Sequence, residues 1–239
     1  MNLILLGYGK MGKAIEAAAY KRGHSIVLAV DQHNFADFEQ LPEQAAHAAI
    51  EFTEPGSAVR NLDLCFAKKI PVVSGTTGWL DQLEEVKARC QQQNGGFFYA
   101  SNFSIGVNLF FRLNQLLAEI MDKQPQYSVQ MEETHHIQKK DAPSGTAITL
   151  AEGIIARLQR KSAWKLANEQ PAETEVPVKV YREEDVPGTH KVEYRSSVDT
   201  LQISHTAHSR EGFASGAVMA AEWLQGRSGV FGMADMLQL

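Results

Sequence analysis

The chain has 239 residues, 44% hydrophobic and 21% charged, which supports one or two globular cores and excludes a disordered or fibrous protein. The formal charge of −5 and the pI of about 5.9 give no basis for a nucleic-acid partner. Cys65 and Cys90 lack the spacing of a zinc or redox site, and the opening apolar run is too short for a signal or membrane helix. We therefore expect a cytoplasmic protein with no membrane segment.

The first thirty residues follow a strand, turn, helix, strand pattern. Residues 3–6 predict a buried strand, 13–22 a helix and 25–30 a second strand, with the acidic Asp31 directly after it. The turn has GxGxxG spacing, and this order and length are typical of a dinucleotide-binding unit rather than of a structural glycine turn. The predicted cofactor-binding residues of the turn are Gly7, Tyr8, Gly9, Lys10, Met11 and Gly12.

The glycines of this turn and the acidic residue have separate roles. Gly7 permits the turn, Gly9 lets a pyrophosphate approach the backbone and Gly12 lets the helix pack against the strand. Asp31 would accept hydrogen bonds from the ribose hydroxyls and repel a 2′-phosphate.

The residues after Asp31 carry no fixed positive charge, which bears on the choice of cofactor. We therefore predict that NADH is favoured over NADPH, although His33 or Lys10 could admit some NADPH.

The alternation of strands and helices continues to about residue 121. It predicts a Rossmann-like parallel sheet with helices on both faces. The loops that follow the strands should line the cofactor groove, and this adds the cofactor-binding residues Gly75, Thr76, Thr77, Ala100, Ser101, Asn102 and Phe103. For Phe103 two alternatives stay open, packing on the nicotinamide or packing in the core.

After residue 122 the pattern changes to strands with a period of two. Segments 127–133, 176–182, 190–196 and 200–206 predict a mixed or antiparallel sheet whose second face is solvated or meets another subunit. We expect 161–175 to be a polar connection and 212–224 to be a helix that packs back on the first domain. The predicted domains are 1–104 with 210–239, for the dinucleotide, and an α+β domain of 105–209, for substrate binding and oligomerisation.

Segment 133–147 places two imidazoles, an amine and a helix start close together. Ser144 can cap a helix over 146–158, so the N–H groups of Gly145 and Thr146 should point outward and bind a carboxylate. A histidine or lysine at this place could donate a proton at neutral pH. The alternatives for the histidine pair are a metal half-site or a surface strand end; no third ligand lies at helical spacing, so we predict no metal.

These residues resemble the dihydrodipicolinate reductase family of bacterial lysine and diaminopimelate synthesis. The family pattern Glu-x-His-His-x-x-Lys-x-Asp-x-Pro-Ser-Gly-Thr-Ala is matched without exception over 133–147, and further matches cover nearly the whole chain. The resemblance implies reduction of 4-hydroxy-tetrahydrodipicolinate, a small cyclic dicarboxylate, to tetrahydrodipicolinate with loss of water, by an oxidoreductase that uses NAD(P)H. It also implies a homotetramer, which we expect to form through the C-terminal sheet.

The resemblance assigns roles to individual residues of the site. His135 is implied as proton donor or acceptor and Lys139 as proton donor. The residues implied to hold the substrate are His136, Gly145, Thr146 and Arg210. The chain lacks the arginine that in some family members follows the acidic residue and contacts a 2′-phosphate.

Two other functions are compatible with the N-terminal pattern. One is another two-domain NAD-dependent dehydrogenase, acting on aspartate or homoserine, and the other is an NADH sensor without turnover. Neither requires the His-His-x-x-Lys and Pro-Ser-Gly-Thr run, so we favour the reductase.

Overall fold

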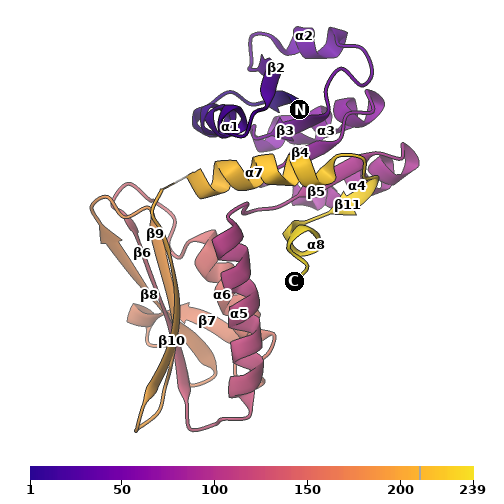
Figure 1. Cartoon of the computed structure of the whole chain (residues 1–239). Helices are drawn as coiled ribbons and strands as arrows, with labels where there is room; N and C mark the ends of the chain where they lie inside the picture. Colours follow the sequence, from indigo (N-terminus) through magenta and orange to yellow (C-terminus); the bar gives the residue numbers. More distant parts are fainter. Residues whose placement is uncertain (210) are drawn as a thin grey trace. The chain divides into compact units, whose positions relative to one another are not determined.

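The computed structural model describes residues 1–209 and 211–239. They form two compact units, one of residues 1–105 and 211–239 and one of residues 106–209 (Figure 1). Each unit has its own sheet and its own core.

The first unit is built on a six-stranded parallel sheet in the order β11-β5-β4-β3-β1-β2. Its strands are β1 (Asn2–Leu6), β2 (Ser25–Val30), β3 (Ala48–Glu51), β4 (Val72–Ser74), β5 (Gly96–Tyr99) and β11 (Gly229–Phe231). Its helices are α1 (Lys10–Lys21), α2 (Phe35–Gln40), α3 (Pro55–Ala67), η1 (Leu80–Gln82), α4 (Leu83–Gln92), α7 (Glu211–Leu224) and α8 (Met233–Leu237).

Alternation along β1 explains why helices cover both faces of this sheet. Leu3 and Leu5 pack in one cluster with α1 and α7, whereas Ile4 and Leu6 pack in a second cluster with α2, α3 and α4. All four side chains are at most 1% exposed. The predicted doubly covered parallel sheet is therefore confirmed, as is the return of the last long helix to the first unit.

The second unit contains a five-stranded mixed sheet in the order β10-β9-β6-β8-β7. Its strands are β6 (Ser128–His136), β7 (Ala163–Leu166), β8 (Glu175–Glu183), β9 (Gly188–Arg195) and β10 (Thr200–Ala207). Its helices are α5 (Ile105–Asp122), whose first residue still belongs to the first unit, α6 (Gly145–Ile155) and η2 (Ala167–Glu169).

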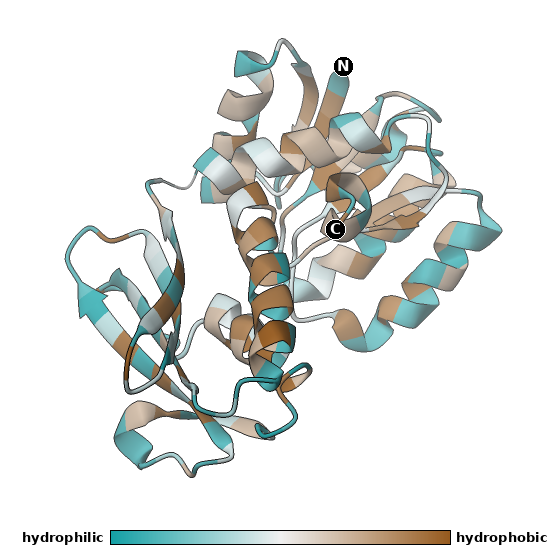
Figure 2. Cartoon of the chain, turned by 60° about the horizontal axis from the view of Figure 1, so that its bottom comes forward, coloured by the Kyte–Doolittle hydropathy of each residue, from teal (hydrophilic) through white to brown (hydrophobic). Residues whose placement is uncertain are grey.

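The two faces of this second sheet differ in chemistry. Helices α5 and α6 cover one face, where Met131 and Val192 are buried, and α5 is largely apolar along its length (Figure 2). The other face carries a row of opposite charges in which Lys191 lies 3.2 Å from both Glu132 and Glu193. The prediction of a mixed sheet with one covered face is confirmed.

Several predicted boundaries are wrong. The first helix begins at Lys10, so Lys10, Met11 and Gly12 belong to its first turn and Gly9 is its N-cap. The predicted polar connection 161–175 contains β7, because Trp164 packs against the core of the second unit.

Three short elements of the first unit are absent from the sequence prediction. They are α2, α8 and the strand β11, which has only three residues and pairs with β5. Segments this short carry too little periodicity to be recognised.

The close approach of α7 to the loop after β5 depends on Gly216. A Cβ at this position would lie 1.9 Å from the carbonyl oxygen of Phe103. We expect Gly216→Ala to lower the free energy of unfolding by about 1–3 kcal/mol through overpacking, measured by urea denaturation. Gly212→Ala in the same helix is the control, because its Cβ would meet only Ser104 Oγ at 3.8 Å; equal stability of the two variants would contradict this packing.

Candidate active site

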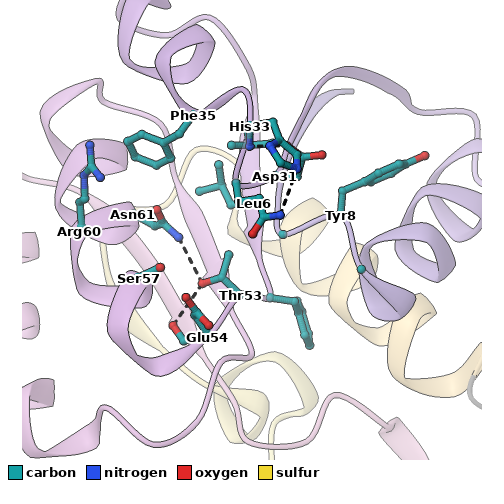
Figure 3. A pocket seen from close by; sticks show the side chains of 15 residues that line it. Leu6, Tyr8, Asp31, His33, Phe35, Thr53, Glu54, Ser57, Arg60 and Asn61 are labelled. Atoms are coloured by element: carbon teal, nitrogen blue, oxygen red, sulfur yellow. Dashed lines mark hydrogen bonds between the residues drawn. The ribbon is translucent and has the colours of Figure 1, made fainter.

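The carboxyl ends of β1, β2 and β3 open into a cavity of about 670 Å³ (Figure 3). Strand β1 lies between β2 and β3, and the residues that follow these three strands line the cavity. Such a reversal of strand order is where dinucleotides bind in doubly wound sheets. The lining residues are Leu6, Gly7, Tyr8, Gly9, Val30, Asp31, Gln32, His33, Phe35, Phe52, Thr53, Glu54, Ser57, Arg60 and Asn61.

The glycine turn has the geometry that a pyrophosphate requires. Gly7 has φ +95°, and a Cβ there would lie 2.0 Å from the carbonyl oxygen of Phe52. A Cβ on Gly12 would lie 2.2 Å from the Gly7 oxygen, whereas nothing lies within 4 Å of one on Gly9. Gly9 caps α1 without a side-chain hydrogen bond, so the helix N-terminus is open to an anion.

Asp31 lies at the exposed end of β2 on this cavity. Its Oδ1 accepts a hydrogen bond from the His33 N–H at 2.7 Å, and its own N–H donates to Asn34 Oδ1 at 2.8 Å. These bonds fix the loop while the carboxylate keeps acceptor capacity for a ribose hydroxyl. Tyr8, by contrast, donates its hydroxyl to Glu16 at 2.5 Å.

A buried carboxylate joins the loops after β3 and β4. Glu51 has no exposed surface and accepts hydrogen bonds from Ser74 Oγ at 2.6 Å, Thr76 Oγ1 at 2.8 Å and the Thr53 N–H at 3.0 Å. The Thr53 hydroxyl also donates to it. Sequence reasoning missed Glu51. An acidic residue inside an apolar strand is buried, so it could have been expected to accept hydrogen bonds from neighbouring loops.

The loops assigned to cofactor binding after β4 and β5 do not line this cavity. Gly75, Thr76 and Thr77 follow β4, where Thr76 is buried and Thr77 exposed. Ala100, Ser101 and Asn102 follow β5; Ser101 is exposed and Asn102 accepts from the Ser104 N–H. They continue the same edge of the sheet, because every strand pair in it is parallel.

The side chain of Phe103 takes the core alternative. It is 2% exposed, and its ring centroid lies 5.9 Å from that of Phe98 and 5.6 Å from that of Phe52. The ring therefore belongs to the core cluster of the first unit, and its contact with a nicotinamide stays a prediction.

In the second unit, polar side chains gather around the buried carboxylate of Glu133. Both of its oxygens accept from the Ser144 N–H at 3.1 Å, and Arg182 Nη2 lies at 3.5 Å. His190 and His135 lie 3.6 and 3.7 Å away. Burial alone would raise the pKa of Glu133, but the nearby His190 and the hydrogen bonds from Ser144 outweigh it and lower the pKa to about 2.

His135 is the second-to-last residue of β6 and lies on the covered face of the sheet. It is 7% exposed and its ring meets the His190 ring edge to face at 5.0 Å. Burial lowers the pKa of His135 to about 4, although the charge of Glu133 opposes this shift. The imidazole is therefore neutral at pH 7, and a bound dianion would favour its protonated form.

The loop after β6 carries the predicted proton donor. Lys139 Nζ lies 2.8 Å from Asp141 Oδ2. Arg182 donates to the carbonyl oxygens of Lys139 at 3.2 Å and Asp141 at 2.6 Å, so the arginine holds the loop that presents the amine. Lys139 also contributes to the charge felt by His135.

Gly145 and Thr146, which are predicted to bind a carboxylate, lie in the first turn of α6. Ser144 caps the helix by accepting from the Ala147 N–H at 3.2 Å, and Gly145 is exposed with nothing within 4 Å of a Cβ. Thr146 follows in the first turn. His136 is half-buried at the next strand position after His135 and so falls on the opposite face of the sheet. Arg210 lies outside the described residues.

Two residues of this cluster were missed by sequence reasoning. His190 pairs with Glu133 across β6 and β9, is 4% exposed, and lies 3.1 Å from Ser144 Oγ. Arg182 pairs with His135 across β6 and β8. The alternation along the strand could have identified His190, because it lies two residues before the buried Val192 and so on the same face of the sheet.

Glu133, His135 and His190 also place ligand atoms within 4.8 Å of one another, a spacing open to a metal ion. The carboxylate, however, already receives the Ser144 N–H and faces the Arg182 guanidinium. We therefore interpret the group as a proton network.

Two family models match this chain. The model described as dihydrodipicolinate reductase, N-terminus, matches residues 1–103, and the model described as dihydrodipicolinate reductase, C-terminus, matches residues 106–237. The chain belongs to the dihydrodipicolinate reductase family. This membership supports a pyridine-nucleotide cofactor in the first unit.

Curated relatives agree with this family. A 4-hydroxy-tetrahydrodipicolinate reductase of Christiangramia forsetii is 49% identical, covering 99% of this chain and 98% of the relative. One of Methanoculleus marisnigri is 37% identical, over 83% and 79% of the two chains.

A solved structure shares the fold. Dihydrodipicolinate reductase from Paenisporosarcina sp. TG-14, bound to dipicolinate, superposes with a TM-score of 0.79 at 20% identity and 98% coverage of both chains. Within the described residues, no helix combines the length and the apolar composition needed to cross a membrane.

The neutral state of His135 can be tested by NMR titration of its ring protons. Because its folded-state pKa lies below the value of about 6.5 for an unfolded imidazole, the unfolded chain binds the proton first. We expect no protonation of His135 above about pH 5, and a loss of folding stability between about pH 6.5 and pH 4.

The Glu133→Gln variant is the control for this titration. Removing the negative charge should lower the pKa of His135 further, since that charge favours the imidazolium. A rise in the pKa would contradict the arrangement.

Proposed function

We propose that this chain catalyses the NADH-dependent reduction of 4-hydroxy-tetrahydrodipicolinate to tetrahydrodipicolinate with loss of water, in lysine and diaminopimelate synthesis. The observation that carries the proposal is the cluster of His135, Lys139 and the capped start of α6 around Glu133, in a chain of the reductase family. NADH is the favoured cofactor and NADPH the alternative.

The glycine turn and the open N-terminus of α1 fit a pyridine dinucleotide. In this proposal the glycine turn 7–12 holds the pyrophosphate and Asp31 the ribose, and the loops after β4 and β5 extend toward the nicotinamide. When bound, the reduced nicotinamide supplies a hydride to the substrate.

The residues of the second unit handle the protons and the substrate's negative charge. Lys139 donates a proton to the electron-rich ring left by reduction, and His135 exchanges a proton with the substrate. Gly145, Thr146, His136 and Arg210 hold the carboxylates. Proton transfer of this kind contributes about 10²- to 10⁴-fold to the rate, and fixed positive partners orient the dianion.

We further propose a cytoplasmic homotetramer that associates through the C-terminal sheet. Both cysteines are free and buried, which agrees with a reducing compartment. The charged second face of the sheet offers opposite charges to a partner. Sedimentation velocity of the purified chain tests the oligomer.

A coupled assay tests the reaction. The unstable substrate is generated from pyruvate and aspartate semialdehyde by a synthase, and NADH or NADPH oxidation is followed by absorbance. Rapid synthase-dependent oxidation supports the reductase. Bound NADH without oxidation would favour a sensor or a different dehydrogenase.

Lys139→Ala separates chemistry from cofactor binding. We expect turnover to fall by about 10²- to 10⁴-fold while the NADH dissociation constant stays unchanged, because the amine acts on the substrate. Lys140→Ala, at the exposed neighbouring lysine, is the control. If NADH binding in Lys139→Ala fell as much as turnover, the assignment of Lys139 as proton donor would be contradicted.

Asp31→Ala tests the choice of cofactor. Loss of the carboxylate removes an acceptor for the ribose hydroxyls and a repulsion of the 2′-phosphate, so NADH binding should weaken more than NADPH binding. Both are measured by fluorescence titration, with Asp37→Ala in α2 as the control. The opposite order would mean that another residue recognises the ribose.

A further inference from the structure

One wall of the nucleotide cavity is made by residues outside the sequence motifs. Phe35 is the first residue of α2 and Arg60 lies in α3, and both line the cavity (Figure 3). The guanidinium carbon of Arg60 lies 4.0 Å from the centroid of the Phe35 ring, so the two groups stack. A purine base stacks readily on aromatic and guanidinium groups.

The position of this wall relative to Asp31 indicates which part of a dinucleotide reaches it. Phe35 follows Asp31 by four residues, and both line the same cavity. In βαβ units the acidic residue after the second strand binds the adenosine ribose. A base attached to that ribose would lie on the side of the cavity that Phe35 and Arg60 line.

The charges around Arg60 favour a base over a phosphate. Arg60 is the one arginine or lysine among the described residues that line the cavity. Its Nη2 lies 2.7 Å from Glu39 Oε1 on α2, so its charge is already paired. With Asp31 on the same cavity, this end of the site offers a 2′-phosphate little net attraction.

We propose that Phe35 and Arg60 bind the adenine ring of the dinucleotide, and that Glu39 is a positioning residue that holds the guanidinium against Phe35. The identity of the ligand rests on the proposed function. Because adenine is common to both cofactors, this wall contributes equally to NADH and NADPH and leaves the discrimination between them to Asp31.

Calorimetric titration with ADP-ribose, NADH and NADPH tests this proposal without any turnover. Phe35→Leu and Arg60→Gln should each weaken all three ligands to a similar extent, by about tenfold. Arg89→Gln is the matched control, because Arg89 forms a comparable ion pair with Asp63 at 2.7 Å but does not line the cavity. Phe35 packs against the core, so Arg60→Gln decides the result if Phe35→Leu is poorly folded.

The positioning role of Glu39 has its own measurement. Glu39→Gln should weaken the three ligands less than Arg60→Gln, and the double variant should bind no more weakly than Arg60→Gln alone. Additive losses would show that Glu39 does not act through Arg60.

Two outcomes would contradict the proposal that Phe35 and Arg60 bind adenine. Weaker binding of NADPH alone would mean that Arg60 binds the 2′-phosphate, and unchanged binding of all three ligands would mean that the wall binds nothing. Failure of the proposed function is distinguishable, because wild-type protein would then bind ADP-ribose but not reduce the dicarboxylate.

Discussion

The chemistry of the second unit depends on one buried carboxylate. Glu133 is 1% exposed and cannot remain ionised there without compensating donors. Those donors are the Ser144 N–H, the Arg182 guanidinium and His190, so a single charge fixes the start of α6, the loop of Lys139 and the environment of His135. Burial keeps His135 neutral, whereas the charge of Glu133 favours its protonated form.

A second buried carboxylate performs a comparable task in the first unit. Glu51 ties the loops after β3 and β4 through the hydroxyls of Thr53, Ser74 and Thr76. Since parallel strands end at the same edge, fixing two loops orders a large part of that edge. In both units a buried carboxylate with a full set of hydrogen bonds, and not apolar packing alone, holds the polar loops in place.

Sequence reasoning was sufficient for the features that short local patterns encode. The strand, GxGxxG and helix order at Gly7 follows from steric rules on glycine and from helix N-termini, and the capped start of α6 follows from Ser144. It failed for β7 and β11, whose few residues are held by neighbouring strands. It left the packing of Phe103 open, because the burial of that ring depends on Phe52 and Phe98.

The sequence by itself determined the family, through the resemblance of its 133–147 motif, and the parallel and mixed sheets, through periodicity along the chain. Only the tertiary structure decided which side chains meet. His190 on β9 pairs with Glu133 on the neighbouring β6, Arg182 comes from β8, and Arg60 of α3 stacks on Phe35 of α2. Contacts of this kind are set by strand register and helix packing, which residues distant in the chain determine together.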